Sequence, residues 1–151
     1  MKFRRAIEAD VELLFDWAND LDVRQNAINT QLITWEGHQK WFQKRLDSSI
    51  SKIFIFLLDE QPIGQVRFEF EKNVWLIDYS VDKLYRGKGL GKSMLKEILN
   101  YFKANEPIIA YVKVENIASA KIFNSLGFKK NEIVEINKIN YQIFEKWKIL
   151  S

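Results

Sequence analysis

Three glycines and three basic residues alternate between residues 86 and 92, in the order Arg-Gly-Lys-Gly-Leu-Gly-Lys. Glycine has no Cβ, so the backbone can turn tightly there and its N–H groups can approach a bound group closely. Apolar residues at helical spacing follow from Leu90, so we expect a helix to begin inside this segment. The first N–H groups of a helix lack intrahelical partners and attract negative charge. The segment therefore predicts a cradle for a pyrophosphate.

Two common phosphate motifs fail here by one residue each. A dinucleotide-binding fingerprint counted from Gly87 requires a glycine at position 92, where this chain has Lys92. A P-loop requires a glycine at position 86, where this chain has Arg86. The pattern that remains is arginine-glycine-x-glycine-x-glycine, after an expected strand that ends at Val81.

That pattern is followed by a second segment, residues 112–128, and the two together resemble the GNAT superfamily of acetyl-CoA-dependent N-acetyltransferases. The resemblance covers nearly the whole chain and implies acetyl-CoA as cosubstrate. It places the pantetheine arm beside the backbone of Val81, near Asn116, in a V-shaped gap between two splayed strands. It places the pyrophosphate on the amides of Arg86, Gly87, Lys88, Gly89, Leu90, Gly91 and Lys92.

The rest of the sequence predicts the elements that hold these segments, as a single domain over residues 1–151. Apolar alternation and β-rich runs predict strands over residues 3–7, 53–58, 63–71, 74–81 and 108–114. A last hairpin is expected within residues 128–150, turning at Asn137-Lys138, although residues 145–148 could equally be a helical end. The expected order is β-α-α-β-β-β-α-β-α-β-β. This is an α/β (α+β) fold with a mixed, mostly antiparallel sheet flanked by helices.

Polar residues ahead of apolar helical patterns predict where helices begin. Asp10, Thr34 and Asn116 are the expected N-caps, in addition to the helix that starts near residue 90. Residues 23–33 show no clear period and predict a loop or irregular helix over a binding site. The first helix is expected to bury Leu13, Leu14, Trp17 and Leu21.

Length and composition narrow the class of protein. With 47% hydrophobic residues, a chain of 151 residues can bury the core of one domain. The absence of cysteine excludes a disulfide framework and an acyl-cysteine intermediate, and the lone His38 leads us to expect no catalytic metal. The net charge of +3, spread among acidic residues, suits an anionic cofactor better than nucleic acid. We expect a cytoplasmic protein with no membrane partner, since no leader or spanning segment is recognisable.

Acetyl transfer to an amine requires a base and a proton donor. We favour Glu69 as the base, with Asp78 and Glu115 as alternatives, and a solvated strand face as the ordinary explanation of Glu69. The resemblance places Phe123 against the cofactor, where the superfamily often has a tyrosine that protonates the departing thiolate. Phe123 has no hydroxyl, so another donor could serve, unless the thiolate leaves without one. The candidates are Tyr79, Ser80, Tyr111 and Tyr141.

The acceptor is suggested by the N-terminal half. Residues 15–24 and 35–42 look like the bacterial subgroup that acetylates UDP-linked 4-amino-4,6-dideoxy sugars, as in the pseudaminic acid pathway, although similar elements occur in ribosomal-protein and polyamine acetyltransferases. For a nucleotide sugar, Arg24 and His38 would contact the diphosphate or the sugar. The ordinary explanations are a solvated loop arginine and a histidine that completes an apolar helix face.

We therefore expect direct transfer of acetyl from acetyl-CoA to a small-molecule primary amine, the 4-amino group of a UDP-linked amino-dideoxy sugar. One alternative is a ribosomal-protein N-terminus or a polyamine as the acceptor. Another is a catalytically inactive acetyl-CoA sensor, which Phe123 leaves open. Edge strands near the C-terminus could pair across a homodimer.

Overall fold

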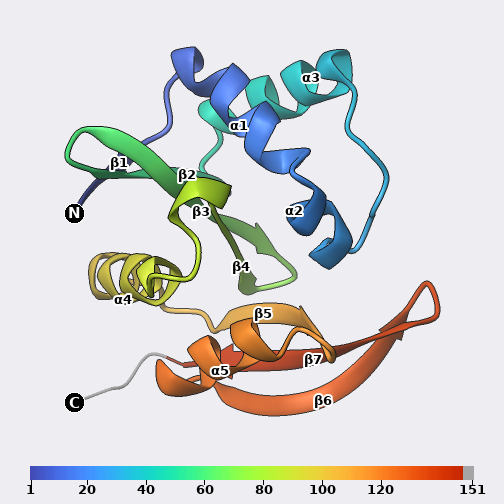
Figure 1. Ribbon diagram of the computed structural model, residues 1–151. Helices are drawn as coiled ribbons and strands as arrows, with labels where there is room; N and C mark the ends of the chain where they lie inside the picture. Colours follow the sequence, from blue (N-terminus) through green and yellow to red (C-terminus); the bar gives the residue numbers. More distant parts are fainter. Residues whose placement is uncertain (148–151) are drawn as a thin grey trace.

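The computed structural model describes residues 1–147, in which seven strands form one sheet of order β1-β2-β3-β4-β5-β7-β6 (Figure 1). All neighbouring strands are antiparallel except β4 and β5, which are parallel. This confirms the mixed, mostly antiparallel sheet. The strands are β1 (Lys2–Arg5), β2 (Ser51–Leu58), β3 (Gln61–Glu71), β4 (Val74–Val81), β5 (Ile108–Lys113), β6 (Lys129–Ile136) and β7 (Ile139–Lys146).

Five α-helices and two short 3-10 turns complete the described chain, one helix more than the expected order contained. Within residues 1–147, no helix combines the length and the apolar character needed to cross a membrane. The helices are α1 (Val11–Ala18), α2 (Leu21–Asn26), α3 (Trp35–Leu46), α4 (Leu90–Tyr101) and α5 (Ile117–Ser125), and the 3-10 turns are η1 (Glu8–Asp10) and η2 (Lys83–Tyr85).

The additional helix arises because the first one ends early. The Asp20 carboxylate accepts hydrogen bonds from the N–H groups of Asp22 and Val23, and so it caps α2 as a separate helix. Leu21 is then 73% exposed, so the prediction that it lies on the buried face was wrong. Leu14 and Trp17 are buried as expected.

Two of the three predicted caps are confirmed as hydrogen-bonding caps. Thr34 Oγ1 accepts from the Gly37 N–H at 3.1 Å, and Asn116 Oδ1 accepts from the Ser119 N–H at 3.3 Å. Asp10 precedes α1 but makes no cap bond to it. Its carboxylate instead accepts two hydrogen bonds from Arg4, at 2.7 and 2.9 Å, and one from the Ile7 N–H.

Tight turns join the antiparallel strands. Asp59-Glu60, Lys72-Asn73 and Asn137-Lys138 all have positive φ at both residues, as in the two-residue turns that match the twist of a hairpin. The predicted last hairpin is confirmed, and Glu145 and Lys146 belong to β7 rather than to a helical end. Lys148, the last residue of that alternative, lies outside the described residues.

Both faces of the sheet are covered. One apolar cluster contains Met94, Leu95 and Ile98 of α4 and Phe123 of α5, packed against Phe68 and other sheet residues. A second, smaller cluster joins α1 and α3 to the opposite face. The pleat therefore directs alternate side chains of β3 and β4 toward α4 and toward α1 and α3.

Strands β4 and β5 are paired only at their beginnings. The register joins Trp75 to Ile108 and Leu76 to Ile109, and no later pair follows. Beyond this point the two parallel strands diverge, and the backbone of residues 77–81 loses its neighbour on one side. The gap predicted between the two strands is present.

Candidate active site

A cavity of about 740 Å³ lies where β4 and β5 diverge. Its walls come from both strands, from the glycine turn, and from α1, α2, α3 and α5. Lys88, whose side chain is exposed, is outside the lining, as are Glu115 and Tyr141, which were alternative candidates for the base and the proton donor. The alternatives Asp78 and Tyr111 line the cavity. The others all line the cavity: Arg24, His38, Glu69, Tyr79, Ser80, Val81, Arg86, Gly87, Gly89, Leu90, Gly91, Lys92, Asn116 and Phe123.

The glycine turn leaves its backbone uncovered. Gly87 and Gly89 have φ of 76° and 74°, in the left-handed region that favours glycine. Gly89 occupies the N-cap of α4 and no side chain caps that helix, so its first N–H groups lack side-chain partners. A Cβ built on Gly87 or Gly89 would meet no atom within 4 Å. The turn therefore fits the diphosphate of a coenzyme A molecule.

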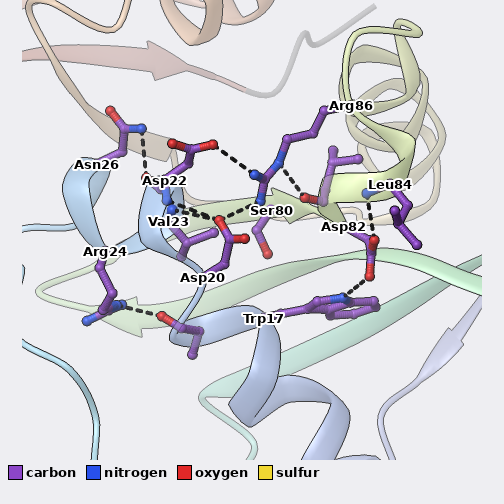
Figure 2. A network of polar contacts seen from close by, with 12 residues as sticks. Trp17, Asp20, Asp22, Val23, Arg24, Asn26, Ser80, Asp82, Leu84 and Arg86 are labelled. Carbon is purple, nitrogen blue, oxygen red and sulfur yellow. Dashed lines mark hydrogen bonds and ion pairs between the residues drawn. The ribbon is translucent and has the colours of Figure 1, made fainter.

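The side chain of Arg86 is engaged elsewhere. Its guanidinium donates to the Val81 carbonyl at 2.9 Å, to Asp22 at 3.0 Å and to Asp20 at 2.8 Å (Figure 2). The guanidinium thus ties α2 to the glycine turn, and the main chain of Arg86 is what remains for a pyrophosphate. A hydrogen bond from Trp17 Nε1 to Asp82, at 2.9 Å, joins α1 to the start of η2, just before the glycine turn (Figure 2).

A pair of hydroxyls bridges the gap. Tyr79 of β4 lies 3.0 Å from Ser119 Oγ on α5, and its ring meets the Phe123 ring edge-on at 5.8 Å. Burial raises the pKa of the Tyr79 hydroxyl, although the hydrogen bond with Ser119 opposes this shift. The group therefore remains a proton donor at neutral pH. Tyr141, another candidate donor, has a buried hydroxyl and does not line the cavity.

The polar face of β3 and β4 forms the cavity floor beneath α3. Glu69 Oε1 is paired with Arg45 at 2.6 Å and lies 3.4 Å from Arg67, whose guanidinium also reaches Asp78 at 3.5 Å. The Trp41 ring lies between the two arginines, 4.4 Å from the Arg45 guanidinium carbon and 5.0 Å from that of Arg67. The floor is thus an ordered charge network rather than a solvated strand face.

His38 and Arg24 both line the cavity but are held by backbone carbonyls. His38 is 2% exposed, and its Nε2 lies 2.8 Å from the Val11 carbonyl. Burial lowers the pKa of His38, so the ring is neutral at pH 7 and Nε2–H donates. Its ring is surrounded by those of Phe15, Trp35, Trp41 and Phe42, as expected for a histidine that completes an apolar helix face. Arg24 donates to carbonyls of the segment that connects α2 to α3.

Several residues that the fold brings to this cavity had no recognisable signal in the sequence. Arg67, Ser119 and Lys113 line it, and Asp22 meets Arg86 there although the two are 64 residues apart in the chain. Among residues 1–147, no cluster of three or more His, Asp and Glu side chains could hold a metal ion. The arrangement combines an anion cradle, a narrow gap, a proton donor and a carboxylate.

Comparison with known proteins gives the family. Residues 1–129 match the acetyltransferase (GNAT) domain. Acetyltransferase PseH from Campylobacter jejuni is 30% identical over 124 residues, 79% of this chain and 76% of that protein. Ribosomal-protein-alanine N-acetyltransferase from Brucella melitensis superposes with a TM-score of 0.83 at 21% identity, over 98% of this chain and 100% of that one. Spermidine N-acetyltransferase from Vibrio cholerae, solved with CoA and spermine, superposes with a TM-score of 0.81 at 15% identity, over 95% of this chain and 92% of that one. The chain therefore belongs to the GNAT family of acetyl-CoA-dependent N-acetyltransferases.

Proposed function

We propose that this acetyltransferase acts on the 4-amino group of a UDP-linked amino-dideoxy sugar. The observation that carries the proposal is one continuous cavity, which joins the glycine turn to a floor of charged and aromatic side chains. Arg24, Arg67 and Lys113 line it together with Glu69 and Asp78, so it suits an acceptor with both an amine and an anionic group. The similarity to PseH over most of both chains supports the same acceptor class.

The proposed reaction is direct transfer. The amine nitrogen attacks the thioester carbonyl, the carbon–sulfur bond breaks, the nitrogen loses a proton and the thiolate gains one. Glu69 is the proposed base. Its Oε1 carries both ion pairs described above, and no hydrogen bond or ion pair within residues 1–147 engages Oε2, which leaves that oxygen for the proton. Tyr79 is the proposed proton donor to the thiolate, with Ser80 as the other candidate.

The remaining predicted residues have binding roles in this proposal. The amides of residues 86–92, including Lys88, bind the diphosphate. The backbone of Val81 and the region of Asn116 and Phe123 hold the pantetheine arm. His38 is buried by aromatic rings, so we propose that it shapes the sugar pocket rather than titrating there. Pairing of β6, which is an edge strand with an exposed face, is the proposed route to a homodimer.

Two alternatives have support of their own. Ribosomal-protein and spermidine acetyltransferases share the fold, at 21% and 15% identity, so a protein N-terminus or a polyamine is the second candidate acceptor. A polyamine is disfavoured by the arginines and the lysine in the cavity wall. An inactive sensor of acetyl-CoA is the third candidate, because Phe123 replaces the usual hydroxyl.

The test is calorimetric titration with acetyl-CoA, followed by thiol release with a panel of amines. The panel contains a UDP-linked 4-amino sugar, the same sugar without the nucleotide, spermine and a ribosomal-protein N-terminal peptide. We expect acetyl-CoA to bind and thiol to be released fastest with the nucleotide sugar. Release with spermine or the peptide alone would replace the proposed acceptor, and binding without release would support the sensor.

A further inference from the structure

Lys113 is a buried cation in the wall of the cavity. It ends β5, is 4% exposed, and its ammonium donates to the main-chain carbonyl of Gln25 in α2. Within residues 1–147 it forms no ion pair with a carboxylate. Within the described residues, its hydrogen-bond partner is a neutral carbonyl.

Arg24, on α2, likewise has only main-chain carbonyls as hydrogen-bond partners within the described residues. Its Nε donates to the Ala18 carbonyl at 2.6 Å, and one terminal nitrogen donates to Asn29 at 2.9 Å and to Gln31 at 3.4 Å, both through main-chain carbonyls. No carboxylate of the described chain pairs with it. Burial lowers the pKa of Arg24, a cost that the more distant charge of Asp78 only partly offsets.

The two half-buried arginines elsewhere in the cavity wall are neutralised, and Lys92 is exposed to solvent. Arg67 has Glu69 and Asp78 as partners, and Arg86 has Asp20 and Asp22. Buried charges in proteins are generally paired, because an unpaired ion loses its hydration without compensation. Lys113, held by an α2 carbonyl, and Arg24, on α2, line one cavity without a carboxylate partner, and together they indicate a missing negative charge. A bound ligand can supply it.

We infer that Lys113 and Arg24 form a subsite for an anionic group of the acceptor, a phosphate, diphosphate or carboxylate. This inference rests on the proposed function and names the feature of the acceptor that the chain selects. The diphosphate of acetyl-CoA already has its own cradle in the glycine turn at α4. Arg24 is close enough to Asp78 and Arg67 of the floor to be affected by their charges, and the proposed function places the acceptor amine at this floor.

The decisive variant is Lys113→Gln, because glutamine keeps an N–H donor for the Gln25 carbonyl and removes the charge. Lys113→Arg keeps the charge, and Lys130→Met, at an exposed site on β6, is the matched control for loss of a lysine. Calorimetry with UDP is performed on protein saturated with CoA, and with CoA on the free protein. Loss of a charged hydrogen bond predicts a roughly tenfold weaker affinity of Lys113→Gln for UDP, with CoA affinity unchanged. Lys113→Arg should retain most of the affinity.

Steady-state kinetics provide the second measurement. Lys113→Gln should raise KM for the nucleotide amino sugar about tenfold and leave KM for the same sugar without nucleotide unchanged. Equal effects on both acceptors, or an effect on CoA affinity alone, would overturn the inference. If the wild type acetylates the nucleotide sugar but Lys113→Gln binds UDP normally, only this inference fails. If the wild type acetylates no nucleotide sugar, the proposed function fails. The comparison of UDP affinity between the wild type and Lys113→Gln still decides whether Lys113 binds an anionic group.

Discussion

The hydroxyl of Tyr79 lies 3.0 Å from Ser119 Oγ, across the gap that β4 and β5 leave between them. Ser119 is one helical turn before Phe123 on the same buried face of α5. The Tyr79 hydroxyl thus lies near the place where Phe123 lacks one, but it comes from the sheet rather than from α5.

Tyr79→Phe should lower kcat on the order of a hundredfold, because a general acid contributes that much when the leaving group needs a proton. Ser119→Ala should have a smaller effect, since Tyr79 keeps its own proton. The raised pKa of Tyr79 predicts that the wild-type rate does not fall up to about pH 10 through loss of this proton. Initial rates of thiol release across pH measure this. An unchanged kcat in Tyr79→Phe would show that the thiolate leaves unaided.

Glu69→Gln should slow turnover at unchanged acetyl-CoA affinity, because glutamine cannot accept the amine proton. The expected loss is on the order of a hundredfold or more in kcat. Glu71→Gln is the matched control, two residues further along the same face of β3 and exposed. Turnover of Glu69→Gln equal to that of the control would remove Glu69 as the base and direct attention to Asp78.

Gly89→Glu should weaken acetyl-CoA binding, since it places a negative charge beside the diphosphate cradle. No atom lies within 4 Å of the Cβ position, so a clash inside the protein is not the cause. Gly89→Ala is the control for backbone strain, because it shares the left-handed φ of 74° and adds no charge. Calorimetry should find a much larger loss of affinity for the glutamate variant, and equal losses would contradict an electrostatic role.

Asp20→Asn should raise the acceptor KM with little change in acetyl-CoA affinity. Asparagine remains a good N-cap for α2 but loses the charge that pairs with Arg86, so α2 keeps only the Asp22 pair and is held less firmly to the glycine turn. The effect should be mimicked in the wild type by raising the salt concentration. Asp16→Asn, exposed on α1, provides the control, and a change confined to the cofactor affinity would argue against this role of α2.

The stability of the N-terminal region should depend on Asp10. Burial would raise the pKa of this carboxyl, but hydrogen bonds from Arg4 and from the Ile7 N–H, with the Arg4 charge, hold it below its usual range. The contribution to stability is therefore complete above about pH 4, the unfolded value, and is lost as the pH falls through the folded pKa. Asp10→Asn should lower the free energy of unfolding by roughly 2 kcal/mol at pH 7 and flatten its acid dependence.

Urea unfolding at pH 7 and pH 3 measures this difference. Glu97→Gln, exposed on α4, controls for removal of a carboxylate. A variant that loses stability equally at both pH values would show that shape, and not charge, is what Asp10 provides.

Local sequence determined much of this protein. The glycine turn, the caps at Thr34 and Asn116 and the hairpin turns depend on neighbouring residues, so their patterns predict them directly. The C-terminal end of the first helix was predicted wrongly, because it depends on the Asp20 carboxylate capping the N–H groups of a separate helix, α2. The same local patterns indicated the family, and they supplied the residues that we propose for the cofactor half of the cavity.

Only the tertiary structure decided which charges meet. Arg86 pairs with Asp22 from 64 residues away, and Lys113 reaches Gln25 from 88 residues away. His38 could be assigned to an aromatic cluster only when α1 was seen to pack on α3. A residue type fixes what a side chain can do, whereas its charge partners and its burial depend on elements distant in the chain. The proposed acceptor half of the site depends largely on such long-range contacts.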